Sequence, residues 1–280
     1  MTPQTAKSFS ALRAVGSALR YLVANRRDLL MLATPPVIAL AIVDALVRLA
    51  VPNSAVAPLP KDAAQMDPNA LLATLGLLAL NLVFYVMFAV AWHRKYLLPQ
   101  ESVTVAGALM WRREKTTFLL RAIAITALSG VGLMLVVLVA TMVAGQSNAG
   151  ATIGGALALL AFLVVFARLS LVLPAMAVGR EEFRIADAWR ATKGQALGMF
   201  LLMLLPTLFA IAVSMPVILL ASGLAAAGLL ETATGYALLA LANQAVNYLV
   251  IALTVSSLSI AYQELAADGP PAPQSSGPHS

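Results

Sequence analysis

The clearest pattern along the chain is an alternation of long apolar runs with short polar connections. A bilayer core of roughly 30 Å needs about 20 helical residues, and six runs reach that length. They cover approximately residues 29–50, 70–92, 118–143, 151–178, 197–221 and 236–262. The pattern therefore predicts an all-α fold, a polytopic transmembrane helical bundle of about six spans.

The fifth run differs from the others because it continues apolar to Leu230 and contains Pro206 and Pro216. Proline removes a backbone donor and bends or breaks a helix inside a membrane, where the freed carbonyls need other partners. We expect a kinked or broken helix here.

Lysine and arginine gather in every second connection. Five precede the first run, five lie between the second and third, and four lie between the fourth and fifth: Lys7, Arg13, Arg20, Arg26, Arg27; Arg94, Lys95, Arg112, Arg113, Lys115; Arg180, Arg184, Arg190, Lys193. The opposite loops contain only Lys61. Because cytoplasmic loops are enriched in such residues, both termini are predicted to be cytoplasmic.

The cationic segments resemble one another. They read ALRYLVANRRDLL from Ala18, ALMWRREKTTFLL from Ala108 and AWRATKGQALGMF from Ala188, and each precedes a pair of apolar runs. This predicts amphipathic helices along the inner leaflet and a weak threefold hairpin repeat, although any inner-membrane protein alternates in a similar way.

The chain divides by composition into three parts. Residues 1–28 form a predicted cytoplasmic amphipathic segment, too long and polar for a signal peptide, and residues 29–265 form the six-helix transmembrane domain. Residues 266–280 are rich in proline, serine and glycine and are predicted to be a disordered cytoplasmic tail.

Composition agrees with a membrane protein, since 61% of the residues are hydrophobic and 11% are charged. Cysteine is absent, which excludes disulfides and thiolate chemistry. The net charge of +6 is carried beside apolar runs without interleaved aromatic residues, so it predicts membrane orientation and no nucleic-acid binding.

The sequence offers no catalytic set. Histidine occurs only at His93, beside Trp92 at the inner end of a span, and at His279 in the tail. A zinc site or a histidine relay would need a pair, and no phosphate loop, nucleophile elbow or HExxH motif is present. We therefore predict a protein that is not an enzyme and that uses no cofactor.

Ionisable groups inside apolar runs are candidates for function because they are costly at membrane depth. Arg121 is close enough to the inner boundary for its side chain to reach the interface. Asp44 and Arg48 are four residues apart and share a helix face. Arg168 is predicted to lie roughly 15 Å above the inner boundary near Val178.

Arg168 at that depth needs a partner. One hypothesis is a long-range ion pair with Asp44, whose predicted depth is similar. The alternative is that Arg48 pairs with Asp44, and that Arg168 binds helix carbonyls or the amide of Asn243.

Three amides, Asn243, Gln244 and Asn247, cluster in the sixth run. They favour either hydrogen bonds between helices or a path for a polar solute. The spacing of Gly150 and Gly154 at the start of the fourth run favours close helix packing or a helix end.

The stretch from Arg168 to Gln195 contains an arginine before Pro174-Ala175, then acidic residues, and then Ala188-Trp189-Arg190 leading to Lys193-Gly194. With AWHRKYLLPQE and AYQEL elsewhere, it resembles a bacterial inner-membrane family related to the membrane domain of some glycerophosphodiester phosphodiesterases. The resemblance implies an integral module of a bacterial inner membrane. The catalytic barrel of some members is missing, so it implies no phosphodiesterase activity.

Two functions remain open from the sequence. The first is a non-enzymatic membrane module that interacts with the lipid bilayer and its anionic phospholipids, with a protein partner or with further copies of itself. The second is a transporter or channel for a small polar or lipidic solute, for which the candidate residues are Asp44, Arg48, Arg168, Asn243, Gln244 and Asn247.

Overall fold

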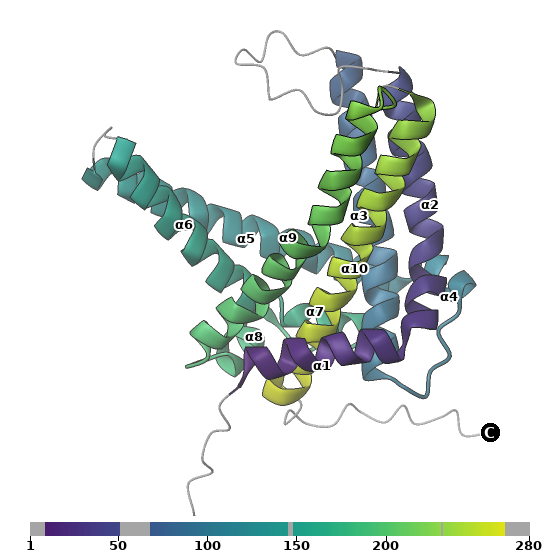
Figure 1. Ribbon diagram of the computed structural model, residues 1–280. Helices are drawn as coiled ribbons and strands as arrows, with labels where there is room; N and C mark the ends of the chain where they lie inside the picture. Colours follow the sequence, from purple (N-terminus) through teal and green to yellow (C-terminus); the bar gives the residue numbers. More distant parts are fainter. Residues whose placement is uncertain (1–8, 51–67, 145–147, 231, 267–280) are drawn as a thin grey trace, which may run out of the picture.

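The computed structural model describes residues 9–50, 68–144, 148–230 and 232–266, and within these ranges the chain is helical and has no strand (Figure 1). Six segments are long and apolar enough to cross a membrane. They contain α2 (Arg26–Ala50), α3 (Pro68–Leu97), α5 (Arg113–Ala144), α6 (Asn148–Leu169) with α7 (Val172–Ala177), α9 (Ala196–Ala226) and α10 (Ala233–Ala266). The predicted transmembrane helical bundle is confirmed.

The remaining helices are short and lie toward one end of the bundle, which we call the basal end. They are α1 (Ala11–Ala24), α4 (Val105–Leu109) and α8 (Ile185–Ala191). Each precedes one helical hairpin, so the order of elements follows the predicted repeat. Ala18, Ala108 and Ala188, which correspond in the three similar segments, are all buried.

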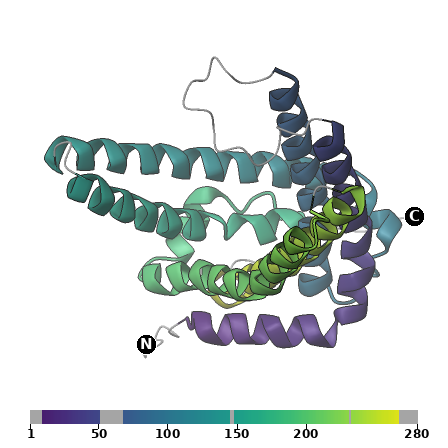
Figure 2. The same ribbon diagram turned by 45° about the horizontal axis from the view of Figure 1, so that its top comes forward.

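The α5–α6 hairpin diverges from α2, α3 and α10 in both views (Figures 1 and 2). Its two helices lie side by side and approach closely at Gly154, where an added Cβ would lie 2.5 Å from the Cβ of Ala140. Contacts this short essentially do not occur, so the absence of a side chain at Gly154 is required for this packing, as the glycine spacing predicts.

The predicted fourth span is not one straight helix. Helix α6 ends at Leu169, and α7 begins at Val172 after a turn in which the N–H of Leu173 donates to Ser170 O at 3.0 Å. Pro174 explains the break, because it has no N–H to donate to Ser170 O and its ring crowds that carbonyl. All six residues of α7 are buried.

The fifth span is bent but not broken. Helix α9 is continuous, contains both Pro206 and Pro216, and changes direction along its length in Figure 1. Thr207 and Ser214, close to the prolines, donate side-chain hydrogen bonds to Met203 O at 2.9 Å and Ala210 O at 2.8 Å. Of the two predicted forms, the kinked helix is therefore observed, because a helix can lose two donors without ending.

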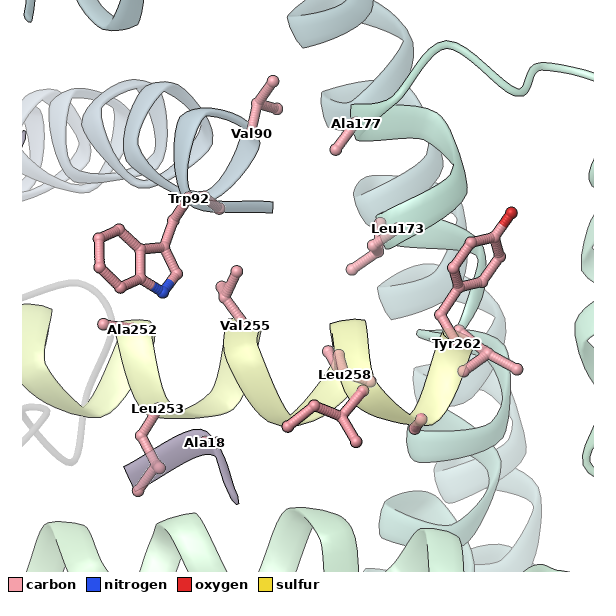
Figure 3. Packing of buried hydrophobic residues seen from close by; sticks show 14 of the residues in the cluster. Ala18, Val90, Trp92, Leu173, Ala177, Ala252, Leu253, Val255, Leu258 and Tyr262 are labelled. Carbon is pink, nitrogen blue, oxygen red and sulfur yellow. The ribbon is translucent and has the colours of Figure 1, made fainter. Parts of the chain in front are cut away.

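The core is densest toward the basal end, where α1 lies across the bundle. Ala14, Ala18 and Leu22 of α1 are buried against the transmembrane helices. Figure 3 shows Ala18 beside Leu253 of α10 and the indole of Trp92 directed at the same helix. The described part of the predicted N-terminal segment therefore shares one core with the spans, whereas residues 267–280 of the predicted tail lie outside the description.

Candidate functional site at the basal end

Helix α1 has an apolar face toward the core and a mixed outer face. Ser10 accepts a hydrogen bond from the N–H of Arg13 and begins the helix, and the side chain of Asn25 donates to Tyr21 O at 2.9 Å where it ends. Leu12 and Val23 remain 69% and 65% exposed beside exposed Arg13 and Arg20. Exposed leucine and valine next to arginine are typical of a helix at a membrane interface.

The aromatic ring of Tyr21 fixes α1 on α3. It packs edge-on against Trp92 and Tyr96, with centroid distances of 5.8 and 4.7 Å. Burial, with smaller effects of Tyr96 and Asp28, raises the pKa of Tyr21 to about 12. Asp28 also forms an ion pair with Lys95, with 2.7 Å between Oδ2 and Nζ, and this pair links the start of α2 to the end of α3.

Arg168 lies against α8. Its Nε donates to Thr192 Oγ1 at 2.9 Å and its Nη2 donates to Trp189 O at 2.8 Å, while its guanidinium carbon is 3.5 Å from the centroid of the Trp189 ring. The guanidinium therefore holds the carboxyl end of α8 by hydrogen bonds and a cation–π contact. These contacts contradict the hypothesis of an ion pair with Asp44 of α2, and the hydrogen bond to Trp189 O agrees with the alternative in which Arg168 binds a helix carbonyl.

The depth assigned to Arg168 was wrong for a physical reason. That depth assumed an unbroken helix to Val178, but the chain turns at Ser170, and Arg168 is the penultimate residue of α6. The side chain therefore reaches the basal helices instead of a partner at mid-span.

Lys115 holds the carboxyl end of α4 in a similar way. Its ammonium donates to the carbonyls of Gly107, Ala108 and Met110, and the residue is only 4% exposed. Lys115 is thus buried and bound to backbone, and it does not act as a surface cation of the predicted inner-leaflet segment.

A cavity of about 140 Å³ lies beside Lys115 between α3, α4 and the start of α5. The ion pair of Arg94 with Glu101 forms one wall of this cavity, with Nη2 2.7 Å from Oε2 and Nε 3.1 Å from Oε1. Arg112 and Glu114 also line the cavity. Arg94 donates further to the backbone oxygen at the end of α7, at 3.1 Å, and connects this wall to that helix. Arg94 and Lys115 are already bound to Glu101 and to backbone carbonyls, and Glu114 lies beside the third cation, Arg112, which favours a structural polar pocket over an anion site.

Two buried side-chain hydrogen bonds join α3 to α10. Trp92 Nε1 donates to Ser256 Oγ at 2.8 Å, and His93 Nδ1 is 2.8 Å from Ser259 Oγ. The Ser259 hydroxyl also donates to Val255 O at 2.9 Å, so we assign the proton of this hydrogen bond to His93 Nδ1. His93 is therefore a buried structural residue.

The outer surface of the basal end combines exposed cations with exposed apolar side chains. The cations are Arg13, Arg20, Arg26, Arg27, Arg112, Arg113, Arg184, Arg190 and Lys193. The apolar side chains include Leu12, Val23, Leu109, Met110, Trp111, Trp189 and Leu197. At the start of α8, the Asp187 carboxylate accepts hydrogen bonds from the backbone N–H of Arg184 and from the Arg190 guanidinium. These contacts lower the pKa of Asp187, and the hydrogen bond from the backbone has the largest effect.

The other predicted residues lie away from this surface. Asp44 is 9% exposed on α2, and Arg121 is half-buried on α5. The Arg48 side chain lies outside what the structure describes. Asn243 and Asn247 are exposed on α10, while Gln244 Oε1 is buried without a hydrogen-bond partner among the described residues.

The predicted residues therefore form no common site with Arg168, because α6 packs on α5, α8 and α9 and not extensively on α2 or α10. Within the described ranges, no group of three or more His, Asp or Glu side chains is placed to hold a metal ion. No family model, curated protein or solved structure matches this chain.

The structural roles of several residues of the basal site were not predicted from sequence, although Lys115 and Trp189 were named there as a loop cation and as part of a motif. The ends of the short helices are held through Lys115, Trp189 and Thr192. The hydroxyl groups of Ser256 and Ser259 accept hydrogen bonds from the side chains of Trp92 and His93. A usable signal was the run of Ser256, Ser257 and Ser259 within an otherwise apolar helix, where polar side chains need partners.

Proposed function

We propose that this protein is a non-enzymatic integral membrane module whose basal surface binds anionic phospholipid of the cytoplasmic leaflet of a bacterial inner membrane. The single observation that carries the proposal is the basal surface, on which nine exposed cations of the described residues lie among exposed leucine, valine, methionine and tryptophan side chains. Basic residues at a membrane surface attract anionic headgroups, and adjacent apolar side chains enter the acyl boundary.

The transport alternative has less support. It needs Arg168 and the amide cluster to line one path, whereas Arg168 contacts α8 and Asn243 and Asn247 are exposed on α10. Their helices do not pack extensively on each other. This separation favours the module over the transporter.

The test is retention of phosphatidylglycerol by the purified protein, measured by native mass spectrometry. The variant Arg13→Gln/Arg27→Gln/Lys193→Gln removes exposed cations whose side chains form no hydrogen bond within the described chain. Each contributes about 1 kcal/mol near an anionic surface, so affinity should fall on the order of 100-fold.

The matched control is Glu181→Gln/Glu182→Gln/Glu264→Gln, which removes exposed carboxylates from the same end. It should retain at least as much phosphatidylglycerol as the parent. Equal retention by the parent and the cation variant would overturn the proposal. Transport of a solute by vesicles containing the protein would favour the alternative.

A further inference from the structure

Helix α10 carries two exposed amides in the part of the chain that crosses the membrane. Asn243 and Asn247 are one helical turn apart and share a face. Neither side chain forms a hydrogen bond with another described residue, so their donors and acceptors are unsatisfied within the bundle.

The depth of these amides follows from the position of α1. This amphipathic helix lies across α10 at Leu253, where Figure 3 places Ala18 beside it. With a rise of 1.5 Å per residue, Asn243 is about 15 Å from Leu253 and about 15 Å from the start of α10 at Ala233. The amide is thus near the middle of a hydrocarbon core of about 30 Å.

An amide in hydrocarbon without a partner is costly, since lipid tails can neither donate nor accept a hydrogen bond. Each asparagine side chain has an NH₂ group that donates and an oxygen that accepts, and so it can pair with its own counterpart on a second helix. A second copy of the chain would therefore satisfy both the donors and the acceptors of this face.

The neighbours of Asn243 have the spacing that such a contact needs. Leu239, Asn243, Val246 and Val250 follow one another at intervals of four, three and four residues, and the three apolar side chains are partly exposed. This is the a/d spacing of a seam between two helices, with Asn243 and Val250 at positions a and Leu239 at a position d. Valine at an a position and leucine at one of the two d positions are compatible with two parallel strands, and one asparagine at a fixes their register.

We propose that the α10 amide face, defined by Leu239, Asn243, Val246, Asn247 and Val250, is the interface of a homodimer. The occupant is a second copy of this chain in the same orientation. Around a two-fold axis along the membrane normal, each Asn243 faces its counterpart in the other copy, and Asn247 lies beside this pair. The asparagines hydrogen-bond across the interface and fix its register.

Cysteine crosslinking in native membranes tests this interface directly, because the chain contains no cysteine. Val246→Cys, at the second d position of the seam, should form a disulfide-linked product with the mass of two 29.2-kDa chains under mild oxidation. Leu241→Cys is the matched control, since Leu241 is also exposed on α10 but lies about 160° around the helix from Asn243. Its product should be weaker on the order of five-fold, because disulfide formation depends steeply on distance.

A second arm separates hydrogen bonding from simple proximity. In the Val246→Cys background, Asn243→Leu/Asn247→Leu should lower the dimer yield several-fold, and Asn243→Gln/Asn247→Gln should restore part of it. Equal yields from Val246→Cys and Leu241→Cys would overturn the proposal. So would an unchanged yield in the folded leucine variant, or a product of another mass, which would mean that a different membrane protein covers the face.

If the leucine variant does not fold, the comparison of the two cysteine positions in the otherwise native chain decides the outcome alone. The test is independent of the lipid proposal, because the substituted residues are remote from the basal cations. Loss of lipid retention with intact crosslinking, or the reverse, would therefore show which of the two proposals fails.

Discussion

The guanidinium of Arg168 stacks on the ring of Trp189, with 3.5 Å between the guanidinium carbon and the ring centroid. The same guanidinium donates to the backbone oxygen of Trp189 at 2.8 Å. One arginine near the end of α6 thus fixes both the side chain and the carboxyl end of α8. A residue that was predicted to lie at mid-span instead orients a short helix of the basal end.

We expect Arg168→Leu to lower the thermal stability of the protein in detergent, because it removes the stacking and two hydrogen bonds. A cation–π contact at a partly exposed site contributes about 0.5 to 1 kcal/mol. A double-mutant cycle of Arg168→Leu with Trp189→Ala should therefore show coupling of about that size. The cycle with Asp44→Leu is the control and should be additive. Coupling to Asp44 instead would restore the long-range ion pair.

Ser256→Ala and Ser259→Ala should each destabilise the bundle by about 1 to 3 kcal/mol, since each leaves a buried ring nitrogen of Trp92 or His93 without its partner. The control is Ser257→Ala, because that buried hydroxyl bonds only to the oxygen four residues earlier in its own helix, at 2.8 Å. Chemical denaturation followed by tryptophan fluorescence measures the difference. Three equal losses would contradict the assigned role of the two hydrogen bonds.

Lys115→Met should destabilise the protein by about 1 to 3 kcal/mol, because the carbonyls of Gly107, Ala108 and Met110 lose their shared donor. Arg113→Gln should have a much smaller effect, since its ion pair with an exposed glutamate is on the surface. Thermal unfolding in detergent compares the two variants. A smaller loss for Lys115→Met than for Arg113→Gln would be inconsistent with a structural lysine.

Gly154→Ala should weaken the α5–α6 hairpin, because the new methyl group would lie 2.5 Å from the Cβ of Ala140. Gly155→Ala is a close control, as an added Cβ there meets nothing within 4 Å. Alanine is about 1 kcal/mol more favourable than glycine inside a helix, so the control should be neutral or stabilising. The melting temperature should therefore fall in the first variant and hold or rise in the second.

Orientation is tested with reporters on the two sides of the predicted membrane. A reporter fused after Glu264 should be active only in a cytoplasmic assay, and one inserted near Asp67 only in an external assay. The physical basis is the concentration of Lys and Arg in the segments on the basal side, against Lys61 in the opposite loops. The reverse pattern would require the opposite orientation or a different number of spans.

The sequence by itself determined the class of the protein. Six apolar runs of sufficient length predict six membrane-spanning segments, because backbone groups in hydrocarbon must bond within a helix. The helices extend beyond the predicted runs at several ends, for example to Leu97 in α3 and to Arg113 in α5, because amphipathic ends continue a helix after the apolar pattern stops.

Only the tertiary structure decided where the polar groups go. A sequence places Arg168 along its own helix but does not reveal that the chain turns at Ser170 and folds α8 back against it. The depth of Arg168 was therefore misjudged, and the sequence could not show which helix carbonyl it would bind. Lys115 and Arg113 look alike in sequence, yet packing buries the first against α4 and exposes the second. Periodicity reports which residues prefer lipid or water, whereas hydrogen-bond partners depend on how remote helices meet.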